Sequence, residues 1–178
     1  LTELGYEVLC GEETLVPEAM MGVPTKEALA KAEERAIAEG ADPVWVTKMS
    51  GGKTGVVGVL RGAKPGNIVG LRFDMDSNDV AETKNPEHKP CQEGFNSLHD
   101  GLMHACGHDG HVTVGLAVAE LLAKHQAELS GTIKIFFQPG EEGVRGAKAM
   151  VANGLADDVD YFLSGHIGFN ANRDGMFA

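Results

Sequence analysis

The sequence predicts an α/β protein folded as a three-layer α/β/α sandwich. Segments typical of strands alternate with segments typical of helices, a pattern that favours one sheet with helices on both faces. The segment Thr132–Phe137 is an almost continuous apolar run, which indicates a strand covered on both faces. The chain of 178 residues is 43% hydrophobic and 23% charged, which is typical of a single globular domain.

The N-terminal part is predicted to hold a helix end, a strand and a longer helix. Leu1–Leu4 is interpreted as the end of an amphipathic helix that Gly5 closes. Tyr6–Cys10 is a short strand candidate. Thr25–Glu39 is rich in Ala, Glu and Lys, which favour helix. Its first residue is a good N-cap, and Gly40 is expected to end it.

Two strands and a long loop are predicted next. Val56–Leu60 and Ile68–Phe73 are rich in β-branched residues, and the turn-forming residues Lys64–Asn67 are expected to join them. Asp79–Leu102 is polar and irregular and contains two prolines. Long loops in compact domains are often functional, so this segment is a candidate for part of a site.

The second half continues the alternation of helices and strands. Val112–His125 is predicted to be a mostly apolar helix that is buried on one side. After the strand Thr132–Phe137, a short helix is expected over Gly146–Asn153, ended by Gly154. Tyr161–Ser164 is predicted to be the last strand.

Composition excludes several classes of partner. The net charge of −11 would repel phosphate backbones, so we expect no nucleic acid partner. No apolar run approaches the ~18 residues of a spanning helix, so we expect no membrane segment. Cys10, Cys91 and Cys106 are too few for a disulfide framework, which favours a reducing compartment such as the cytoplasm.

Both ends of the chain suggest a piece of a longer protein. The sequence starts at Leu1 without a Met or a signal peptide, and the turn-forming cluster Asn170–Gly175 leads to no further element.

The densest group of chemically active residues is Met103–His111, which contains three histidines and a cysteine. In an extended segment alternate side chains share a face, so Cys106 and His108 are expected to point the same way. Both are good ligands for a borderline-soft divalent ion, and Gly107 between them allows the backbone to bend. The motif therefore predicts a metal site.

Other residues of this motif have less certain roles. Asp109 is expected to cap the following helix or to hydrogen-bond a ligating histidine. His104 and His111 are weaker ligand candidates, because only one face of the segment can meet the metal. The alternative interpretation is a polar turn before a helix, but the local density of histidines favours the metal.

Acidic residues follow two of the predicted strands. Glu141 and Glu142 form an adjacent pair at a Pro-Gly turn, where one could bind metal and the other could move protons. A surface turn or an acidic helix start is the alternative. Asp74 and Asp76 share a face in an extended chain after Ile68–Phe73, although aspartates there could simply form a turn.

A lone histidine, His166, follows the last predicted strand between two glycines. All four motifs are interpreted as following strands that could be parallel in one sheet. Ligand sites of open α/β sheets lie beyond the carboxyl ends of strands, so their convergence predicts a metal site at a sheet edge.

Taken together, the four motifs resemble the dinuclear-metal aminoacylase family, which includes hippurate hydrolases, N-acyl-amino-acid amidohydrolases and plant auxin-conjugate hydrolases. The matching segments are Arg72–Asp76, Met103–His111, Phe137–Gly143 and Gly165–Gly168. The resemblance is strongest to the A-subunit type of the branch that cleaves p-aminobenzoyl-glutamate. That closer likeness depends on Met21–Pro24, Gly51–Gly55 and Val159–Phe162.

The resemblance implies a role for individual residues and a need for metal. It implies two divalent ions per full-length subunit, Mn²⁺ or Zn²⁺, and Glu141 as the general base. Asp76 would support the site without binding metal. Gly140 stands where relatives often have Ala, which should not change the ligands. The implied metal ligands are Cys106, His108, Glu142 and His166.

The resemblance also implies a larger enzyme. Residues 1–178 would be the N-terminal part of a zinc-peptidase-like catalytic domain, without the family's inserted dimerisation domain and without a later histidine ligand. The full-length protein would hydrolyse a small acyl-amino-acid substrate, releasing p-aminobenzoate and glutamate from p-aminobenzoyl-glutamate. It would form a homodimer, or a heterodimer with a related subunit. We expect the 178-residue chain alone to be inactive.

Three alternatives remain at this point. The substrate could be another N-acyl or hippurate-type amide. The chain could be a binding module with a structural metal, although a closed metal site has no use for a free carboxylate such as Glu141. A cysteine hydrolase using Cys106 and His108 would leave Glu141, Glu142 and His166 without a function.

Overall fold

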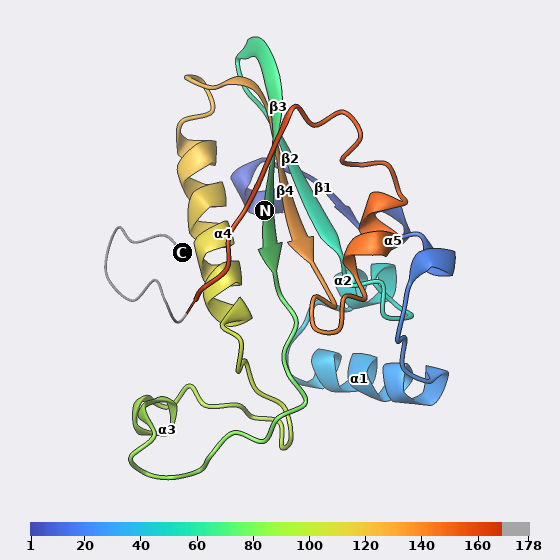
Figure 1. The fold of residues 1–178 in the computed structure, drawn as a ribbon, viewed down its shortest axis with the longest axis vertical. Coiled ribbons are helices and arrows are strands. Elements are labelled where there is room, and N and C mark those ends of the chain that lie inside the picture. Colours follow the sequence, from blue (N-terminus) through green and yellow to red (C-terminus); the bar gives the residue numbers. More distant parts are fainter. Residues whose placement is uncertain (169–178) are drawn as a thin grey trace.

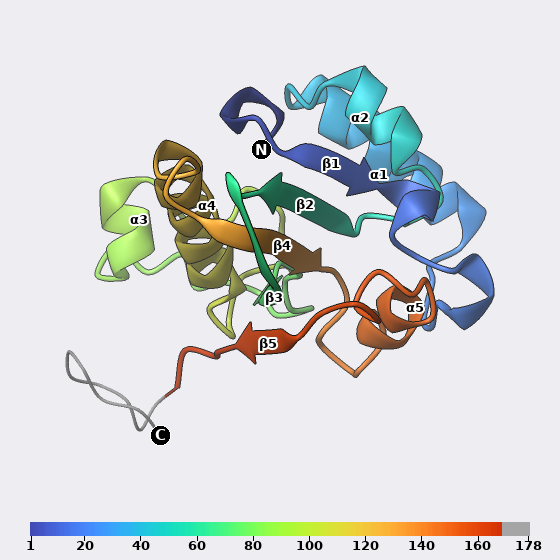
Figure 2. The ribbon, with the colours of Figure 1, turned by 90° about the horizontal axis from the view of Figure 1, so that it is seen from above.

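A single mixed sheet with helices on both faces forms the centre of the protein (Figures 1 and 2). The computed structural model describes residues 1–168, and the predicted turn cluster at 170–175 lies outside these residues. The predicted three-layer α/β/α sandwich is confirmed: α4 covers one face of the sheet and α5 covers the other (Figure 2).

The sheet has five strands in the order β1-β2-β4-β3-β5. β3, β4 and β5 are mutually parallel, whereas β1 and β2 are antiparallel to their neighbours. The carboxyl ends of the three parallel strands therefore meet at one edge. The strands are β1 (Glu7–Cys10), β2 (Val56–Arg61), β3 (Lys64–Asp74), β4 (Ser130–Gln138) and β5 (Tyr161–Ser164).

The helices connect and cover these strands. The α-helices are α1 (Lys26–Ala38), α2 (Pro43–Lys48), α3 (Lys89–Glu93), α4 (His108–Lys124) and α5 (Ala147–Val151). Three short 3₁₀ helices lie in the N-terminal part, at Thr2–Leu4, Gly11–Glu13 and Pro17–Ala19. Among the described residues, no helix is both long and apolar enough to cross a membrane.

The order of the parallel strands explains the two helical layers. The chain moves from β3 through α4 to β4, then passes back through α5 to β5 on the other side of β3. Right-handed crossovers that run in opposite directions place their helices on opposite faces. The core under α4 contains Tyr6, Leu60, Ala119, Ile135 and Phe137. The core under α5 contains Leu15, Val57, Val59, Phe136, Ala149 and Met150.

Several local predictions are confirmed by the backbone. The Thr25 hydroxyl accepts a hydrogen bond from the Ala28 N–H at 3.2 Å and so caps α1. Gly5 is left-handed, with φ 85°, and closes the first 3₁₀ helix. The predicted loop over residues 79–102 is largely irregular, with α3 as its one helix and Asn78 bridged to Met103 at its base.

The prediction that residues 64–67 form a turn between two neighbouring strands is wrong. They are the first part of β3, and β4 separates β2 from β3 in the sheet. The register between β3 and β4 shifts between Lys64 and Ile68. Such a bulge accommodates Pro65 and Gly66 within a strand, so turn-forming residues there do not end it.

The predicted start of the long helix at Val112 is also wrong. α4 starts at His108, and Gly107 precedes it with φ 90° as the N-cap. The sequence analysis placed the start at the first apolar residues, but the polar first turn is helical too. Cys106 and His108 therefore do not lie on one extended segment.

Candidate metal centre

Four chain segments meet at the edge formed by the carboxyl ends of β3, β4 and β5. Three of them follow these strands, as predicted for Asp74 and Asp76, for Glu141 and Glu142, and for His166. The fourth does not follow a strand: residues 103–111 lead from the long loop into the first turn of α4. The N-terminal end of α4 lies at the same edge as the ends of β3 and β4 (Figure 1).

His108 is fully buried, and its ring has a defined orientation. Its Nδ1 donates to the backbone oxygen of Asp76 at 3.0 Å and lies 3.3 Å from Asp76 Oδ1. Because Nδ1 carries the proton, Nε2 has a free lone pair. That lone pair is available to an electrophile at the cluster.

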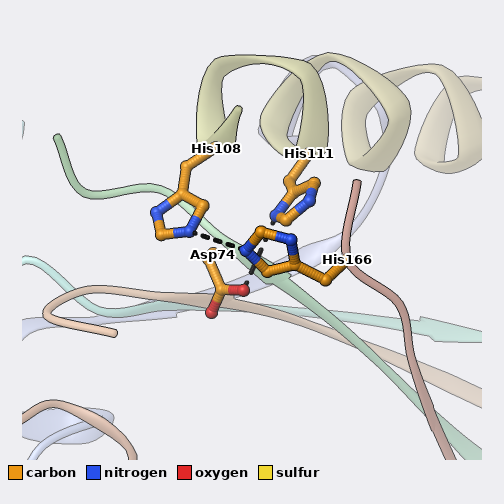
Figure 3. A group of neighbouring side chains, drawn as sticks. All are labelled: Asp74, His108, His111 and His166. Carbon is orange, nitrogen blue, oxygen red and sulfur yellow. Dashed lines mark hydrogen bonds and ion pairs between the residues drawn. The ribbon is translucent and has the colours of Figure 1, made fainter. Parts of the chain in front are cut away.

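His166 presents its own Nε2 to the same point. Its Nδ1 donates to the Ile167 backbone oxygen at 2.6 Å, and its Nε2 lies 3.3 Å from Nε2 of His108 (Figure 3). The Sγ atom of Cys106 lies 3.4 Å from the same nitrogen. Two unprotonated nitrogens this close repel each other unless a proton or a cation lies between them.

Cys106, His108 and Glu142 form a second close group. One ligand atom from each lies within 4.8 Å of the others, and Glu142 Oε1 is buried without a hydrogen-bond partner among the described residues. Burial, together with the neighbouring Glu142 carboxylate, raises the pKa of the Cys106 thiol. A raised pKa makes a thiol a poor nucleophile, which disfavours the cysteine hydrolase alternative.

Asp76 holds the acidic turn after β4. Its Oδ1 accepts the N–H of Glu141 and its Oδ2 accepts the N–H of Glu142, both at 3.0 Å. The side chain of Glu141 remains about one third exposed, with Oε2 3.8 Å from His108 Nε2. Adjacent carboxylates thus reach different surroundings, as expected from their directions along the chain.

The structure adds Asp74 and His111 to the residues around the cluster (Figure 3). His111 Nε2 accepts the N–H of Ile167 at 2.9 Å, so its proton is on Nδ1, 3.6 Å from Asp74 Oδ2. Asp74 is almost fully buried and pairs with the guanidinium of Arg72. His111 therefore holds the backbone beside His166.

Burial and the nearby rings of His166 and His108 lower the pKa of His111, so this ring is neutral at pH 7. A helix starting at His108 would have indicated the contribution of His111, because residues three apart share a helix face. His104 and Asp109 are exposed and contribute no atom to the two groups of close ligand atoms. No side-chain cap comes from Asp109 at the start of α4, where Gly107 is the N-cap.

The donor atoms fit a divalent transition metal. Two nitrogens bound tetrahedrally at ~2.0–2.1 Å from one ion lie about 3.3 Å apart, which matches the two Nε2 atoms. Sulfur, imidazole and carboxylate donors together suit ions of the Zn²⁺ type. The unpartnered oxygen of Glu142 and the two facing nitrogens would each gain a partner from such an ion.

Comparison with known proteins gives a consistent result. The model of peptidase family M20/M25/M40 matches residues 70–177. A Haemophilus influenzae protein, the homolog of the A subunit of p-aminobenzoyl-glutamate hydrolase, is 47% identical over 174 residues, or 97% of this chain. The chain spans 40% of the length of that relative.

Two solved structures share the fold. The aminobenzoyl-glutamate utilization protein from Klebsiella pneumoniae matches with a TM-score of 0.75 and 39% identity, covering 96% of this chain and 36% of that one. A dinuclear metal binding peptidase from the M20 family, the Bacillus subtilis protein YXEP, matches with a TM-score of 0.59 and 32% identity. That match covers 80% of this chain and 37% of the Bacillus protein.

Proposed function

Because this chain belongs to peptidase family M20/M25/M40, we propose that the full-length protein hydrolyses the amide bond of an N-acyl amino acid with the help of divalent metal ions. The observation that carries the proposal is the cluster of Cys106, His108, Glu142 and His166 beside a separate carboxylate, Glu141. A purely structural metal site would not need that second carboxylate.

Cys106, His108, Glu142 and His166 would hold metal in this proposal, and the full-length subunit would bind two ions. When bound, such ions supply Lewis acidity for the amide carbonyl and lower the pKa of water. Both Mn²⁺ and Zn²⁺ are compatible with the family, and the thiolate of Cys106 favours the softer Zn²⁺.

Glu141 is the general base of the proposed reaction. Its side chain is about one third exposed and ends 3.8 Å from His108 Nε2, so it can reach a water molecule beside the cluster. It would take a proton from that water at a carboxylate oxygen and later give it to the departing amine. Asp76 positions this base, because its carboxylate holds the Glu141 and Glu142 N–H groups.

The finer parts of the proposal follow the relatives. The substrate is p-aminobenzoyl-glutamate, which is named in the Haemophilus relative, and cleavage gives p-aminobenzoate and glutamate. That relative is named after one of several subunits, which supports a homodimer or a heterodimer with a related chain. The three free cysteines favour a reducing compartment such as the cytoplasm. Residues 1–178 then form the N-terminal part of the catalytic domain.

The test is a hydrolysis screen of N-acyl amino acids with the full-length protein and Mn²⁺ or Zn²⁺. We expect p-aminobenzoyl-glutamate to be cleaved, with chelator abolishing turnover. Glu141→Gln should keep stoichiometric metal but lose about 10²–10⁴-fold in kcat, because the amide cannot accept the proton. Glu87→Gln, at an exposed position in the long loop, is the matched control and should retain activity.

Two outcomes would contradict the proposal. Metal-independent cleavage would remove the metal from the reaction. Near-normal turnover of Glu141→Gln with bound metal would remove Glu141 from the role of base.

A further inference from the structure

A cavity of about 580 Å³ opens beside the candidate metal centre. Asp76 and Glu142 line it on the side of the cluster, and Met20, Met21 and Val23 form an apolar wall. A pocket with apolar walls and few polar groups is typical of a small-molecule site. Its place next to the metal centre makes it the space available to a substrate.

Arg145 is the only basic residue that lines this cavity. It lies at the end of the turn that carries Glu141 and Glu142, and its backbone N–H donates to the Gly140 oxygen at 2.9 Å. Within residues 1–168, no carboxylate oxygen lies within 4.0 Å of its guanidinium. The protein has a net charge of −11, so a cation without an ion pair at this place requires an explanation.

Two glycines leave room for the Arg145 side chain. A Cβ atom at Gly22 would lie 2.7 Å from Cδ and 2.9 Å from Nε of Arg145, and one at Gly143 would lie 3.0 Å from Nε. Gly22 comes from the segment beside the apolar wall, far from Arg145 in the sequence. The guanidinium is thus held between two distant segments instead of extending freely into solvent.

The backbone before Arg145 is strained. Val144 has φ 58°, the only positive φ of a non-glycine residue in the described part of the chain, and its side chain is 80% exposed. A β-branched residue in this conformation is a genuine outlier and costs of order 1–3 kcal/mol. Burial of Val144 does not offset this cost, but the conformation directs the next residue to the cavity.

From these observations we propose that Arg145 binds the side-chain carboxylate of an acidic amino acid in the substrate. The planar fork of a guanidinium matches a carboxylate with two hydrogen bonds. The guanidinium is more than 4.0 Å from the carboxylates of Asp76 and Glu142 and so lies apart from the reacting amide. The α-carboxylate is one carbon from the scissile nitrogen, whereas the side-chain carboxylate of glutamate lies several bonds further away.

This inference rests on the proposed function and adds specificity to it. The protein would prefer N-acyl glutamate over the matching N-acyl glutamine, which has the same shape without the charge. A site built for a charged group rejects an analogue that lacks it, because the buried partner is then left unpaired.

The experiment compares kcat/KM of the full-length metal-loaded enzyme for p-aminobenzoyl-glutamate and p-aminobenzoyl-glutamine. Arg145→Gln should lower kcat/KM for the glutamate substrate by about 10- to 100-fold, mainly through KM. The value for the glutamine substrate should change by less than about 3-fold. Arg145→Lys should be intermediate, because it keeps the charge without the fork. Lys148→Gln removes an exposed cation that does not line the cavity and should change neither value.

A second variant reaches the same guanidinium indirectly. Gly22→Ala should reduce the preference for glutamate, because the new Cβ displaces Arg145. Gly94→Ala is its control: φ is also positive, at 75°, but a Cβ there meets no atom within 4 Å.

Each outcome has one meaning. An equal loss on both substrates in Arg145→Gln, or no loss on either, would overturn the role of Arg145 and leave the proposed function standing. Failure of the wild type to hydrolyse any N-acyl amino acid would overturn the proposed function and this inference with it.

Discussion

At the residue scale, Asp76 connects three of the four segments of the candidate centre. It lies just after β3, its carboxylate holds the turn after β4, and its backbone oxygen orients His108 at the start of α4. A single side chain therefore sets the relative positions of a ligand candidate and of the proposed base.

Asp76→Asn tests this connection. Asparagine keeps one acceptor oxygen, so one of the two N–H groups of Glu141 and Glu142 would face an NH₂ group instead. Loss of such a supporting contact typically costs 10–100-fold in metal affinity or activity, and we expect the same range here. Metal titration and turnover measure it. Asp100→Asn, at a side chain 89% exposed, is the control, and equal effects of both changes would contradict the role of Asp76.

Tyr6 gives a pH-dependent prediction at the same scale. Burial raises the pKa of its phenol from 10.0 to about 12, and the hydroxyl donates to the Ala119 backbone oxygen at 3.0 Å. Below pH 10 the phenol is neutral in both folded and unfolded chains. Between pH 10 and about 12 only the unfolded chain ionises, so stability falls by roughly 2–3 kcal/mol across this range.

Urea unfolding at pH 8 and pH 11.5 measures this fall against Tyr6→Phe. The variant should be about 1 kcal/mol less stable at pH 8, where it lacks the hydrogen bond, and should lose less stability at high pH. Lysines titrate in both proteins and cancel in the comparison. Identical pH dependence of the two proteins would show that Tyr6 is not the group responsible.

At the element scale, α4 packs closely on the sheet and carries His108 and His111 at its first turn. Gly115 makes this close approach possible. A Cβ there would lie 2.8 Å from Phe137 and 2.9 Å from Phe73, whose rings are in contact with each other. The position of the histidines relative to β3 and β5 depends on this packing.

Gly115→Ala should destabilise the protein by about 1–2 kcal/mol. Alanine favours helix by ~1 kcal/mol, but overpacking against two rings typically costs 1–3 kcal/mol or more. The shift in urea midpoint measures the sum. Val114→Ala, one residue away and 52% exposed, should change stability by no more than ~0.5 kcal/mol. A more stable Gly115→Ala protein would mean that α4 has room to move.

At the scale of the whole molecule, the candidate centre joins segments that the sheet alone holds loosely. His108 and Cys106 come from residues 103–111, Glu142 from the turn after β4, and His166 from the segment after β5. An ion bound to all of them would link these segments across the sheet edge. Metal binding to the folded state alone stabilises it by mass action.

We therefore expect Zn²⁺ or Mn²⁺ to raise the Tm of the full-length protein. At a free concentration 100 times Kd the gain is about 2.7 kcal/mol. Chelator should reverse it, and Cys106→Ser should reduce it. Cys91→Ser changes a cysteine outside the cluster and should leave it intact. An unchanged Tm with stoichiometric metal bound would show that the ion does not link these segments.

Much of the fold could be predicted from the sequence because its signals are local. Apolar and β-branched runs indicated all five strands, and capping residues such as Thr25 and Gly5 indicated where helices begin and end. Cysteine, histidine and carboxylate residues at short spacing indicated a candidate metal centre, since these side chains are suited to metal whatever the fold around them.

What only the tertiary structure decided depends on contacts between distant residues. The position of β4 between β2 and β3 follows from strand pairing, and the hydrogen bond of His111 to Ile167 spans 56 residues. Arg145 reaches the cavity because Gly22, from another segment, leaves room for it. Propensity and spacing act over a few residues, whereas pairing and packing free energies depend on the complete fold. The sequence by itself thus determined which side chains could do the chemistry, and the packed sheet and helices decided which of them meet.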